Sequence, residues 1–406
     1  PEIRFDGFTY DWEQRKLGEL GSLKNGMNFS KEALGHGFPF INLQNIFGNN
    51  VIDVNKLELA DATEKQLLEY SLLKGDVLFV RSSVKLEGVG EAALVPETFE
   101  NTTYSGFIIR FRDEYGLNND FKKYIFGTQK VRNQIMAQAT NSANKNISQG
   151  VLENLTFEVP SFDEQAKIGE HFSNLDHLIT LHQRKCEQTK KLKKYMLQKM
   201  FPQNGAKVPE IRFDGFTYDW EQRKLGDVCS RVQGNDGRMK LPTLTISAGN
   251  GWMRQEDRFS GNIAGNEQKN YTLLHTGELS YNHGNSKLAK YGAVFSLRNY
   301  EEALVPRVYH SFRVEEGCAD YIEYYFATKL PDRELRKLIS SGARMDGLLN
   351  IGYDEFMGIK MMFPSIKEQN EIATYFRSLD HLITLHQRKC DELKKMKKYM
   401  LQNMFI

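Results

Sequence analysis

Residues 175–186 read LDHLITLHQRKC, and residues 379–390 read LDHLITLHQRKC again. The repetition extends outward from this run. Between residues 160–201 and 364–405, 28 of 42 positions are identical. Two copies of one long segment, placed about 200 residues apart, indicate a duplication at the scale of a domain and not a solenoid of short repeats.

A second repeated pair precedes these blocks. Residues 1–20 read PEIRFDGFTYDWEQRKLGEL and residues 209–228 read PEIRFDGFTYDWEQRKLGDV, so 18 of 20 positions are identical. The stretches between the repeated blocks, 20–159 and 228–363, share little beyond scattered echoes. Because drift alone would spread differences evenly, we infer that the constant and variable segments serve different purposes.

Each long constant block predicts one helix. In the first, Pro160 precedes Ser161 as the N-cap, and Glu164 completes a capping box. Apolar residues then recur at spacings of three and four, and no Gly or Pro interrupts residues 170–201. About 36 helical residues at 1.5 Å each make a rod of about 54 Å. The block 364–405 repeats the pattern.

A helix with a single apolar stripe needs a partner, and the obvious partner is the other copy. The residues expected to pair the helices or to contact another subunit are Phe172, Leu175, Leu178, Ile179, Phe376, Leu379, Leu382 and Ile383. The pattern alone leaves parallel and antiparallel pairing open. It also leaves open that each helix packs on its own domain.

His182 and Cys186 share one helix face, and His386 and Cys390 repeat them. Two facing copies would offer two His and two Cys, which is a zinc ligand set. Small or polar residues that fix the register of a helix seam are the commoner use of such positions. We therefore predict no metal.

The distal part of each helix is basic. Residues 184–199 hold seven Lys or Arg and one Glu, net +6, and residues 388–403 are net +4. The variable regions are nearly neutral, with 14 basic against 16 acidic residues in 20–159 and 17 against 16 in 228–363. A basic run is either a solvated face or a surface for DNA phosphates or an acidic protein, and the sequence leaves both open.

Each variable region is expected to be an α+β domain with its own core. The expected strands are 75–81, 107–111, 293–297 and 309–314, and the expected helices are 121–138 and 320–340.

The variable regions also carry polar and aromatic loop residues. Arg and Lys match guanine edges, and Asn and Gln match adenine edges, although such stretches are often plain loops. The candidate DNA-binding residues are Asn45, Arg81, Ser82, Lys85, Tyr104, Asn144, Lys145, Asn250, Arg254, Tyr281, Asn282, Asn285, Lys287 and Arg344.

The composition bounds the protein class. With 406 residues, 40% hydrophobic and 26% charged, the chain is long enough for several folded domains. It has no apolar run of about 18 residues and opens without a signal-peptide pattern, and its four Cys suit a reducing compartment, so we expect a cytoplasmic protein. The start at Pro1, without an initiator Met, leaves a trimmed N-terminus open.

Several catalytic signatures are missing. Gly is never followed by Lys, which excludes a P-loop, and neither Pro-Pro, HExxH nor GxSxG occurs. The chain therefore reads as a binding scaffold. Two other hypotheses are a coiled-coil adaptor that never touches DNA and a self-contained methyltransferase–nuclease component, against which the missing signatures argue.

A family resemblance rests on the ordered motifs. Pro-x-x-x-Glu-Gln opens each helix, Leu-Asp-x-Leu-Ile follows, and Trp-x-x-x-Lys-Leu-Gly (Trp12 to Gly18, Trp220 to Gly226) precedes each variable region. In this order, over its whole length, the chain resembles the specificity subunit of type I restriction–modification systems.

The resemblance implies an architecture. Two target-recognition domains would each read one half of an asymmetric, bipartite DNA site, and the two helices would pair as an antiparallel coiled coil that acts as a ruler. The implied domains are 1–159, 160–202, 203–363 and 364–406, related by a pseudo-two-fold internal repeat.

The resemblance also implies partners. Two modification subunits would dock on the helices and methylate adenine with S-adenosylmethionine, and two motor–nuclease subunits would use ATP and Mg. The chain itself would be non-catalytic and hold no cofactor.

Overall fold

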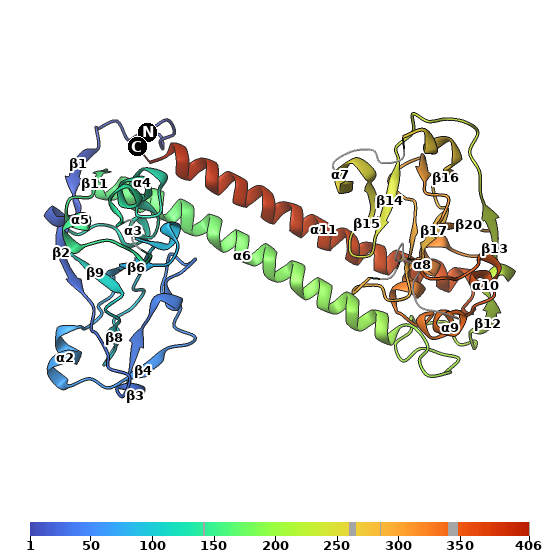
Figure 1. The fold of residues 1–406 in the computed structure, drawn as a ribbon, viewed down its shortest axis with the longest axis horizontal. Coiled ribbons are helices and arrows are strands. Elements are labelled where there is room, and N and C mark those ends of the chain that lie inside the picture. The colour runs from blue at the N-terminus through green and yellow to red at the C-terminus, as the bar shows by residue number, and fades with distance from the viewer. Residues whose placement is uncertain (141–142, 260–264, 285, 340–347, 406) are drawn as a thin grey trace. The chain divides into compact units, whose positions relative to one another are not determined.

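The computed structural model divides into two compact units, each containing one variable region and half of each long helix (Figure 1). The first unit comprises residues 1–183 and 387–406, and the second comprises 184–386. The structure describes residues 1–140, 143–259, 265–284, 286–339 and 348–405. The predicted boundaries at 159, 202 and 363 remain a prediction, because the compact units divide both helices.

The two predicted long helices are present as α6 (Phe162–Lys199) and α11 (Ile366–Asn403), each of 38 residues. Ser161 Oγ accepts a hydrogen bond from the Glu164 amide at 3.4 Å, as expected of an N-cap. The capping-box role expected for the Glu164 carboxylate is wrong. Both of its oxygens instead bind Arg4, at 2.7 and 2.8 Å, because a buried carboxylate is better matched by a guanidinium.

In the first unit the two helices are antiparallel. Phe172, early in α6, meets Phe405 beyond the end of α11, while Asp176 accepts a hydrogen bond from Lys397 at 2.5 Å. Tyr124 of the variable region donates to the same Asp176 at 2.9 Å, and its ring lies 5.1 Å from that of Phe172. Burial raises the pKa of Tyr124, so its hydroxyl stays protonated as a donor. Lys397 of α11 also lies over the Tyr124 ring, 5.1 Å from its centroid, so the variable region packs on both helices.

The second unit repeats this arrangement. Phe376 meets Phe201, and Asp380 accepts a hydrogen bond from Lys193 at 2.5 Å and another from Tyr324 at 2.8 Å. Adding 204 to Asp176 gives Asp380, and adding 204 to Lys193 gives Lys397, so the repeat exchanges the Asp176–Lys397 contact with the Asp380–Lys193 contact. The antiparallel coiled-coil pairing and the internal repeat are therefore confirmed.

Six of the eight predicted pairing residues lie on the buried stripe. Phe172, Leu175, Ile179, Phe376 and Leu379 are buried, and Ile383 is half-buried. Leu178 and Leu382 are 39% and 40% exposed, so their assignment to the buried stripe is wrong. The stripe steps from 175 to 179, and a helix turns by about 100° per residue, which carries position 178 off the contact line.

The short repeated segments dock on the helix ends. The Ile3 amide donates to the carbonyl of Asn403, and the Ile211 amide donates to that of Lys199. In the first unit this places the two chain ends beside each other (Figure 1). Arg212 binds Glu368 in the second unit as Arg4 binds Glu164 in the first.

The first unit is an α+β domain. Its strands are β1 (Glu13–Lys16), β2 (Gly21–Asn25), β3 (Leu34–Ile41), β4 (Glu58–Ala60), β5 (Val77–Val80), β6 (Ser82–Ser83), β7 (Ala92–Leu94), β8 (Thr103–Tyr104), β9 (Ile108–Asp113), β10 (Lys145–Asn146) and β11 (Thr156–Val159). Its shorter helices are α1 (Leu17–Leu20), α2 (Glu64–Glu69), α3 (Asn119–Ile125), α4 (Gln129–Gln138) and α5 (Gln149–Glu153), with 3-10 turns η1 (Leu43–Asn45) and η2 (Leu86–Gly88).

The second unit has the same class. Its strands are β12 (Glu221–Lys224), β13 (Cys229–Val232), β14 (Leu244–Ser247), β15 (Gly251–Arg254), β16 (Thr272–His275), β17 (Leu279–Asn282), β18 (Ala293–Ser296), β19 (Glu302–Val305), β20 (His310–Val314) and β21 (Lys360–Phe363). Its shorter helices are α7 (Gln255–Phe259), α8 (Ala319–Ala327), α9 (Asp332–Leu338) and α10 (Tyr353–Met357), with 3-10 turns η3 (Leu225–Asp227) and η4 (Gly265–Asn270).

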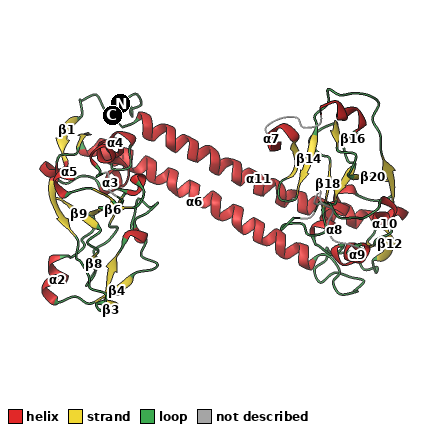
Figure 2. Cartoon of the chain, in the orientation of Figure 1, coloured by secondary structure: helices red, strands yellow, loops and turns green. Residues whose placement is uncertain are grey.

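A four-stranded antiparallel sheet lies at the centre of each unit (Figure 2). Its order is β2-β9-β5-β7 in the first unit and β13-β20-β17-β18 in the second. The helices pack against one hydrophobic core of each unit. A second, smaller core includes residues of the remaining strands and, in the first unit, also Leu78, Val80, Ala93 and Ile108 of the central sheet. The four predicted strands all appear, as β5, β9, β18 and β20.

Each predicted single helix of the variable regions is two helices. The stretch 121–138 divides at Gly127 between α3 and α4, and the stretch 320–340 divides between α8 and α9. In the second case Lys329 has a φ of 67° and Pro331 precedes α9, so the backbone leaves the helical conformation there.

Gly169 of α6 allows the helix to touch the variable region closely. A Cβ at this position would lie 2.6 Å from Asp120 Cβ and 2.7 Å from the Phe121 amide nitrogen. We expect Gly169→Ala to destabilise the full chain by about 2 kcal/mol in urea unfolding, because the overpacking exceeds the gain of about 1 kcal/mol in helix propensity.

The repeat supplies a matched control for this substitution. The equivalent position, 169 + 204 = 373, is already a buried Ala. Ala373→Gly should cost about 1–2 kcal/mol, from the difference in helix propensity and the loss of one buried methyl group. A neutral or stabilising Gly169→Ala would contradict the close packing.

Candidate nucleic-acid interface

Five candidate residues of the first variable region come together where β5 ends. β6 pairs with β10, which sets Ser82 opposite Asn146 and Ser83 opposite Lys145. The Ile147 amide also donates to the carbonyl of Arg81. Candidates from 81–85 and 144–145, about 60 residues apart in sequence, thus share one surface because a strand pair joins them.

A cleft of about 520 Å³ opens beside this strand pair, and Lys85 and Asn144 line it. Two apolar side chains that the sequence analysis missed stand at it: Val84 is 78% exposed and Phe107 is 57% exposed. The sequence pattern predicts a strand from Phe107, whereas β9 begins one residue later. Exposed apolar groups amid polar and basic ones suit contact with base edges or thymine methyl groups.

Two candidates of the first region belong to the core instead. Asn45 is buried, and its Nδ2 donates to the carbonyls of Asp53 and Lys56. Tyr104 is fully buried, and burial raises the pKa of its hydroxyl. Neither side chain is available to a base, so these two assignments are wrong for a physical reason: their polar atoms are used inside the fold.

Arg81 is half-buried, and its Nη1 donates to the Gly106 carbonyl at 3.3 Å. This contact ties the end of β5 to the turn that carries Phe107, because Phe107 also accepts from the Arg81 amide. Arg81 therefore stabilises the conformation of the turn that carries Phe107.

In the second unit the equivalent place is the end of β17, where Gly284 forms a bridge with Leu348. Tyr281 is fully buried there, stacked on Phe356 at 4.3 Å, and its hydroxyl donates to the Tyr291 carbonyl. Its assignment as a DNA-binding residue is wrong. Asn282 is half-buried and bonded to Ile246 and Gly284, so it shapes the loop.

The exposed candidates of the second region are Asn250, Arg254 and Lys287. Arg254 forms an ion pair with Glu256 at 2.7 Å, which partly neutralises the charge of the arginine. Two further candidates, Asn285 and Arg344, lie outside the described residues.

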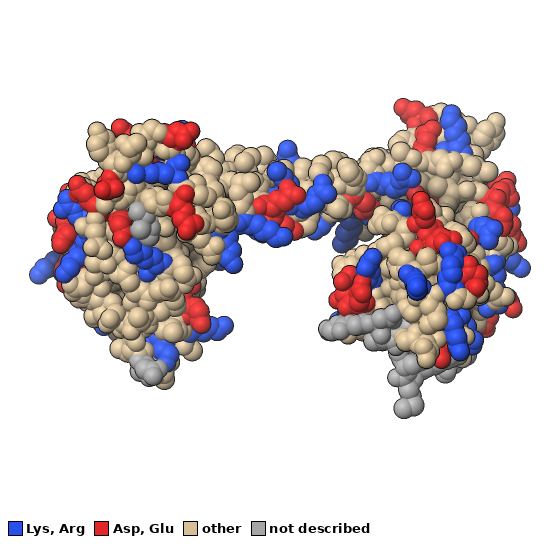
Figure 3. Space-filling view, turned by 90° about the horizontal axis from the view of Figure 1, so that it is seen from above, with Lys and Arg blue, Asp and Glu red and all other residues tan. Residues whose placement is uncertain are grey.

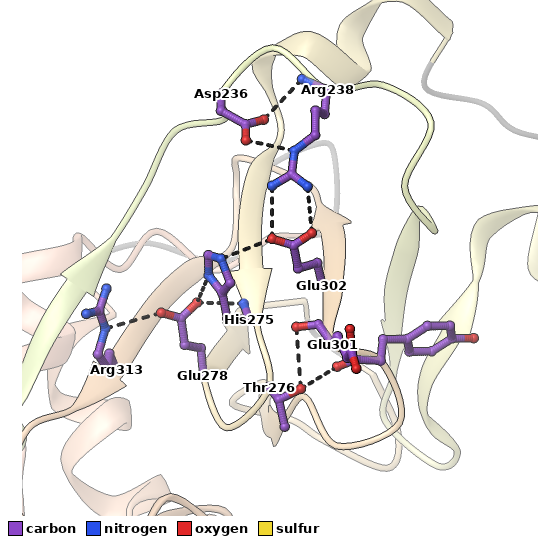
Figure 4. Close-up of polar contacts among 9 residues, drawn as sticks. Asp236, Arg238, His275, Thr276, Glu278, Glu301, Glu302 and Arg313 are labelled. Carbon is purple, nitrogen blue, oxygen red and sulfur yellow. Dashed lines mark hydrogen bonds and ion pairs between the residues drawn. The ribbon is translucent and has the colours of Figure 1, made fainter.

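Several basic side chains of the second region are neutralised by a polar network (Figure 4). Arg238 binds both oxygens of Glu302, at 2.6 and 2.9 Å, and also Asp236 at 2.7 Å. The guanidinium lowers the pKa of Glu302. His275 links Glu302 to Glu278, which Arg313 reaches at 3.2 Å (Figure 4). These arginines are therefore committed to protein contacts.

Side chains of both signs alternate over the visible face of each variable region (Figure 3). This agrees with the net charges of 14 − 16 = −2 and 17 − 16 = +1. Any attraction of these regions for DNA must come from local groups and not from a strongly basic surface.

The repeated His and Cys positions of the helices do not form a metal site among the described residues. Cys186 is buried and its thiol lies 3.8 Å from the Ile383 carbonyl, while Cys390 is buried in the first unit. Among the residues that the structure describes, no three His, Cys, Asp or Glu form a group that could hold a metal ion.

Both halves of the chain match one protein family. The model of the type I restriction modification DNA specificity domain matches residues 10–191 and 218–395. This chain belongs to that family. Each specificity domain spans one variable region and most of the helix that follows it.

Two relatives with a specificity-subunit name differ from this chain at most aligned positions. Over 226 residues the chain is 26% identical to the putative type I restriction enzyme MjaX specificity subunit of Methanocaldococcus jannaschii, covering 53% of this chain and 52% of that protein. Over 151 residues it is 28% identical to the EcoKI specificity subunit of Escherichia coli, covering 37% and 32%. These alignments span less than two thirds of either relative.

The fold of a solved specificity subunit is similar throughout. The S subunit of a type I restriction-modification system from M. genitalium aligns with 100% of this chain and 99% of its own, with a TM-score of 0.59 and 14% identity. In the described part of this specificity-domain chain, no helix is both long enough and apolar enough to cross a membrane.

Proposed function

We propose that this chain is the DNA specificity subunit of a type I restriction–modification complex. Each variable region reads one half of an asymmetric, bipartite DNA site, and the chain performs no chemistry itself. One observation carries this proposal: the contacts that hold each variable region on the helices are repeated, whereas the exposed loop surfaces differ. Asp176 and Asp380 accept the same Tyr and Lys hydrogen bonds in both units.

A repeated frame that presents two unlike surfaces suits two unlike half-sites. The exposed side chains at the cleft of the first region differ from those of the second: Ser286 stands where the first region has Val84. The helices set the spacing between the halves. A rod of about 54 Å, less the overlap with the domains, is compatible with half-sites about one DNA turn apart, which is about 34–36 Å.

Exposed residues that are identical in the two helices support the docking of a partner present in two copies. Leu178 and Leu382 are exposed, as are Tyr195 at 48% and Tyr399 at 58%. Because these side chains are exposed, packing between the two helices does not explain why both copies carry the same residue. Exposed apolar side chains on paired helices are typical of protein interfaces. We assign these faces to methyltransferase subunits, which supply S-adenosylmethionine chemistry on adenine. Motor–nuclease subunits with ATP and Mg complete the complex.

The variable regions carry almost no net charge. Counterion release from DNA scales with the number of phosphates that a protein neutralises. This subunit alone should therefore bind DNA weakly, with most phosphate contacts made by its partners.

Methylome sequencing tests the proposal. Deleting the gene should abolish adenine methylation at one split motif, and restoring the gene should return it. A coiled-coil adaptor that never touches DNA predicts an unchanged methylome, and that result would refute the specificity role.

A further inference from the structure

The two variable regions share one loop frame although their sequences differ. In the first, Gly75 and Gly90 have φ of 92° and 68°, and in the second, Gly277 and Gly292 have φ of 87° and 83°. Both pairs are 15 residues apart, since 90 − 75 = 292 − 277. A positive φ favours glycine, so each segment, which consists of a central strand (β5 or β17) and the loop after it, has a glycine turn at each end.

The second glycine of each pair is also closely packed. A Cβ at Gly90 would lie 2.4 Å from Ile135 Cγ2, and one at Gly292 would lie 2.5 Å from Tyr281 Cε2. The end of each segment is therefore held against a buried side chain, Ile135 or Tyr281, by close packing as well as by backbone conformation.

One exposed lysine occupies the same position in both frames. Lys85 and Lys287 each stand ten residues after the first glycine, since 85 − 75 = 287 − 277, and each precedes a leucine. Both lysines are exposed, and neither forms an ion pair with any residue in the described ranges. Their neighbours differ: Val84 precedes one and Ser286 precedes the other.

Lys85 lies beside other candidate residues of its region, and the residue after Lys287 contacts the loop that carries another candidate. Lys85 lines the cleft together with Ser82 and Asn144. Leu288, 71% exposed, lies against Gly249, because a Cβ there would be 3.2 Å from Leu288 Cδ1. Lys287 is thus close in the chain to a contact with the loop that carries Asn250.

We propose that Lys85 and Lys287 bind DNA phosphates and set the register of each variable region on its half-site without reading bases. This rests on the proposed function. A residue common to two modules that read different sequences cannot distinguish those sequences, so discrimination falls to the positions that differ. Lysine is a compact point charge, which suits a phosphate, and phosphate contacts position a protein without specifying sequence.

The location favours DNA over a protein partner as the occupant. The lysines lie in the variable regions, next to unlike polar and apolar loops, whereas the exposed residues shared by the helices lie in the constant segments. A partner that docks twice in the same way needs like surroundings at both places, and these loops do not offer them.

Salt dependence of binding tests the proposal. The full chain, in complex with its methyltransferase subunits, is titrated with two duplexes, one carrying the methylated motif and one lacking it, at about 50 to about 200 mM salt. Lys85→Ala and Lys287→Ala should each make the slope of log K against log salt less steep by about 0.9. Each should weaken both duplexes by the same factor and leave the methylated motif unchanged.

Controls separate charge from fold. Lys85→Arg and Lys287→Arg keep the charge and should keep the wild-type slope. Lys65→Ala, at an exposed position of α2 outside the frame, should also keep it. Thermal unfolding of each variant should match that of the wild type.

Three results would overturn the proposal. An unchanged slope and affinity in the Ala variants would show that both lysines are solvated and do not contact DNA. A changed base in the methylated motif would show that the lysines contact bases. Failure of the complex to assemble would show that they contact a protein subunit. If the wild-type complex does not prefer the motif duplex at all, the proposed function fails independently of these lysines.

Discussion

Exchanging residues 20–159 for the variable region of another specificity-domain protein is expected to change one half of the methylated motif and leave the other half intact. The reason is that each variable region lies in its own unit, with its own sheet and cores. The incoming region should carry a Tyr at position 124, because that hydroxyl binds Asp176 on the helix. Methylome sequencing of cells with the hybrid gene measures the result.

The reciprocal exchange, of residues 228–363, is the matched control and should change the other half of the motif. Here the incoming region should keep Tyr324, the donor to Asp380. If either exchange alters both halves, the two regions do not read DNA as separate modules. If neither alters the motif, the variable regions do not carry the specificity.

A large effect on stability is expected from Arg212→Ala. Arg212 binds both oxygens of Glu368, a side chain that is 1% exposed, at 2.7 and 2.8 Å. Removal of one partner of a fully buried ion pair costs about 3–5 kcal/mol, because the other charge stays buried without compensation. Since Arg212 itself is 15% exposed and Trp220 still donates to Glu368, we expect about 2 kcal/mol in urea unfolding.

Two variants bracket this effect. Arg212→Lys keeps the charge but loses the two-pronged contact, and it should fall between wild type and Arg212→Ala. Arg223→Ala removes an arginine whose partner, Glu316, is 56% exposed, and it should cost less than about 1 kcal/mol. If Arg212→Ala is no worse than Arg223→Ala, the contact between the repeated segment and the helix does not stabilise the unit.

The long helices were predictable because their signals are local. Ser161, the uninterrupted apolar spacing and the absence of Gly and Pro after position 170 all lie within the segment that they describe. The same reasoning failed at Glu164, because its partner Arg4 lies 160 residues away. It also failed at Leu178, where the pattern of apolar residues is wider than the contact line.

The candidate interface shows the same limit. Lys85 and Asn144 do lie on one surface, whereas Asn45, Tyr104 and Tyr281 are core residues. The sequence of a loop does not show whether the polar atoms of an Asn or Tyr face solvent or a carbonyl inside the fold. For Asn45 the partners are 8 and 11 residues away, and for Tyr104 the nearest acceptor is 80 residues away.

By itself the sequence determined the duplication, the two helices and their capping serines, and the motifs that resemble the specificity family, because repetition and helical periodicity are written in consecutive residues. Only the tertiary structure decided that the helices run antiparallel in each unit, that Glu164 belongs to Arg4, and which polar loop residues remain exposed. Those outcomes depend on contacts between residues far apart in the chain, and burial is a property of such contacts and not of residue type.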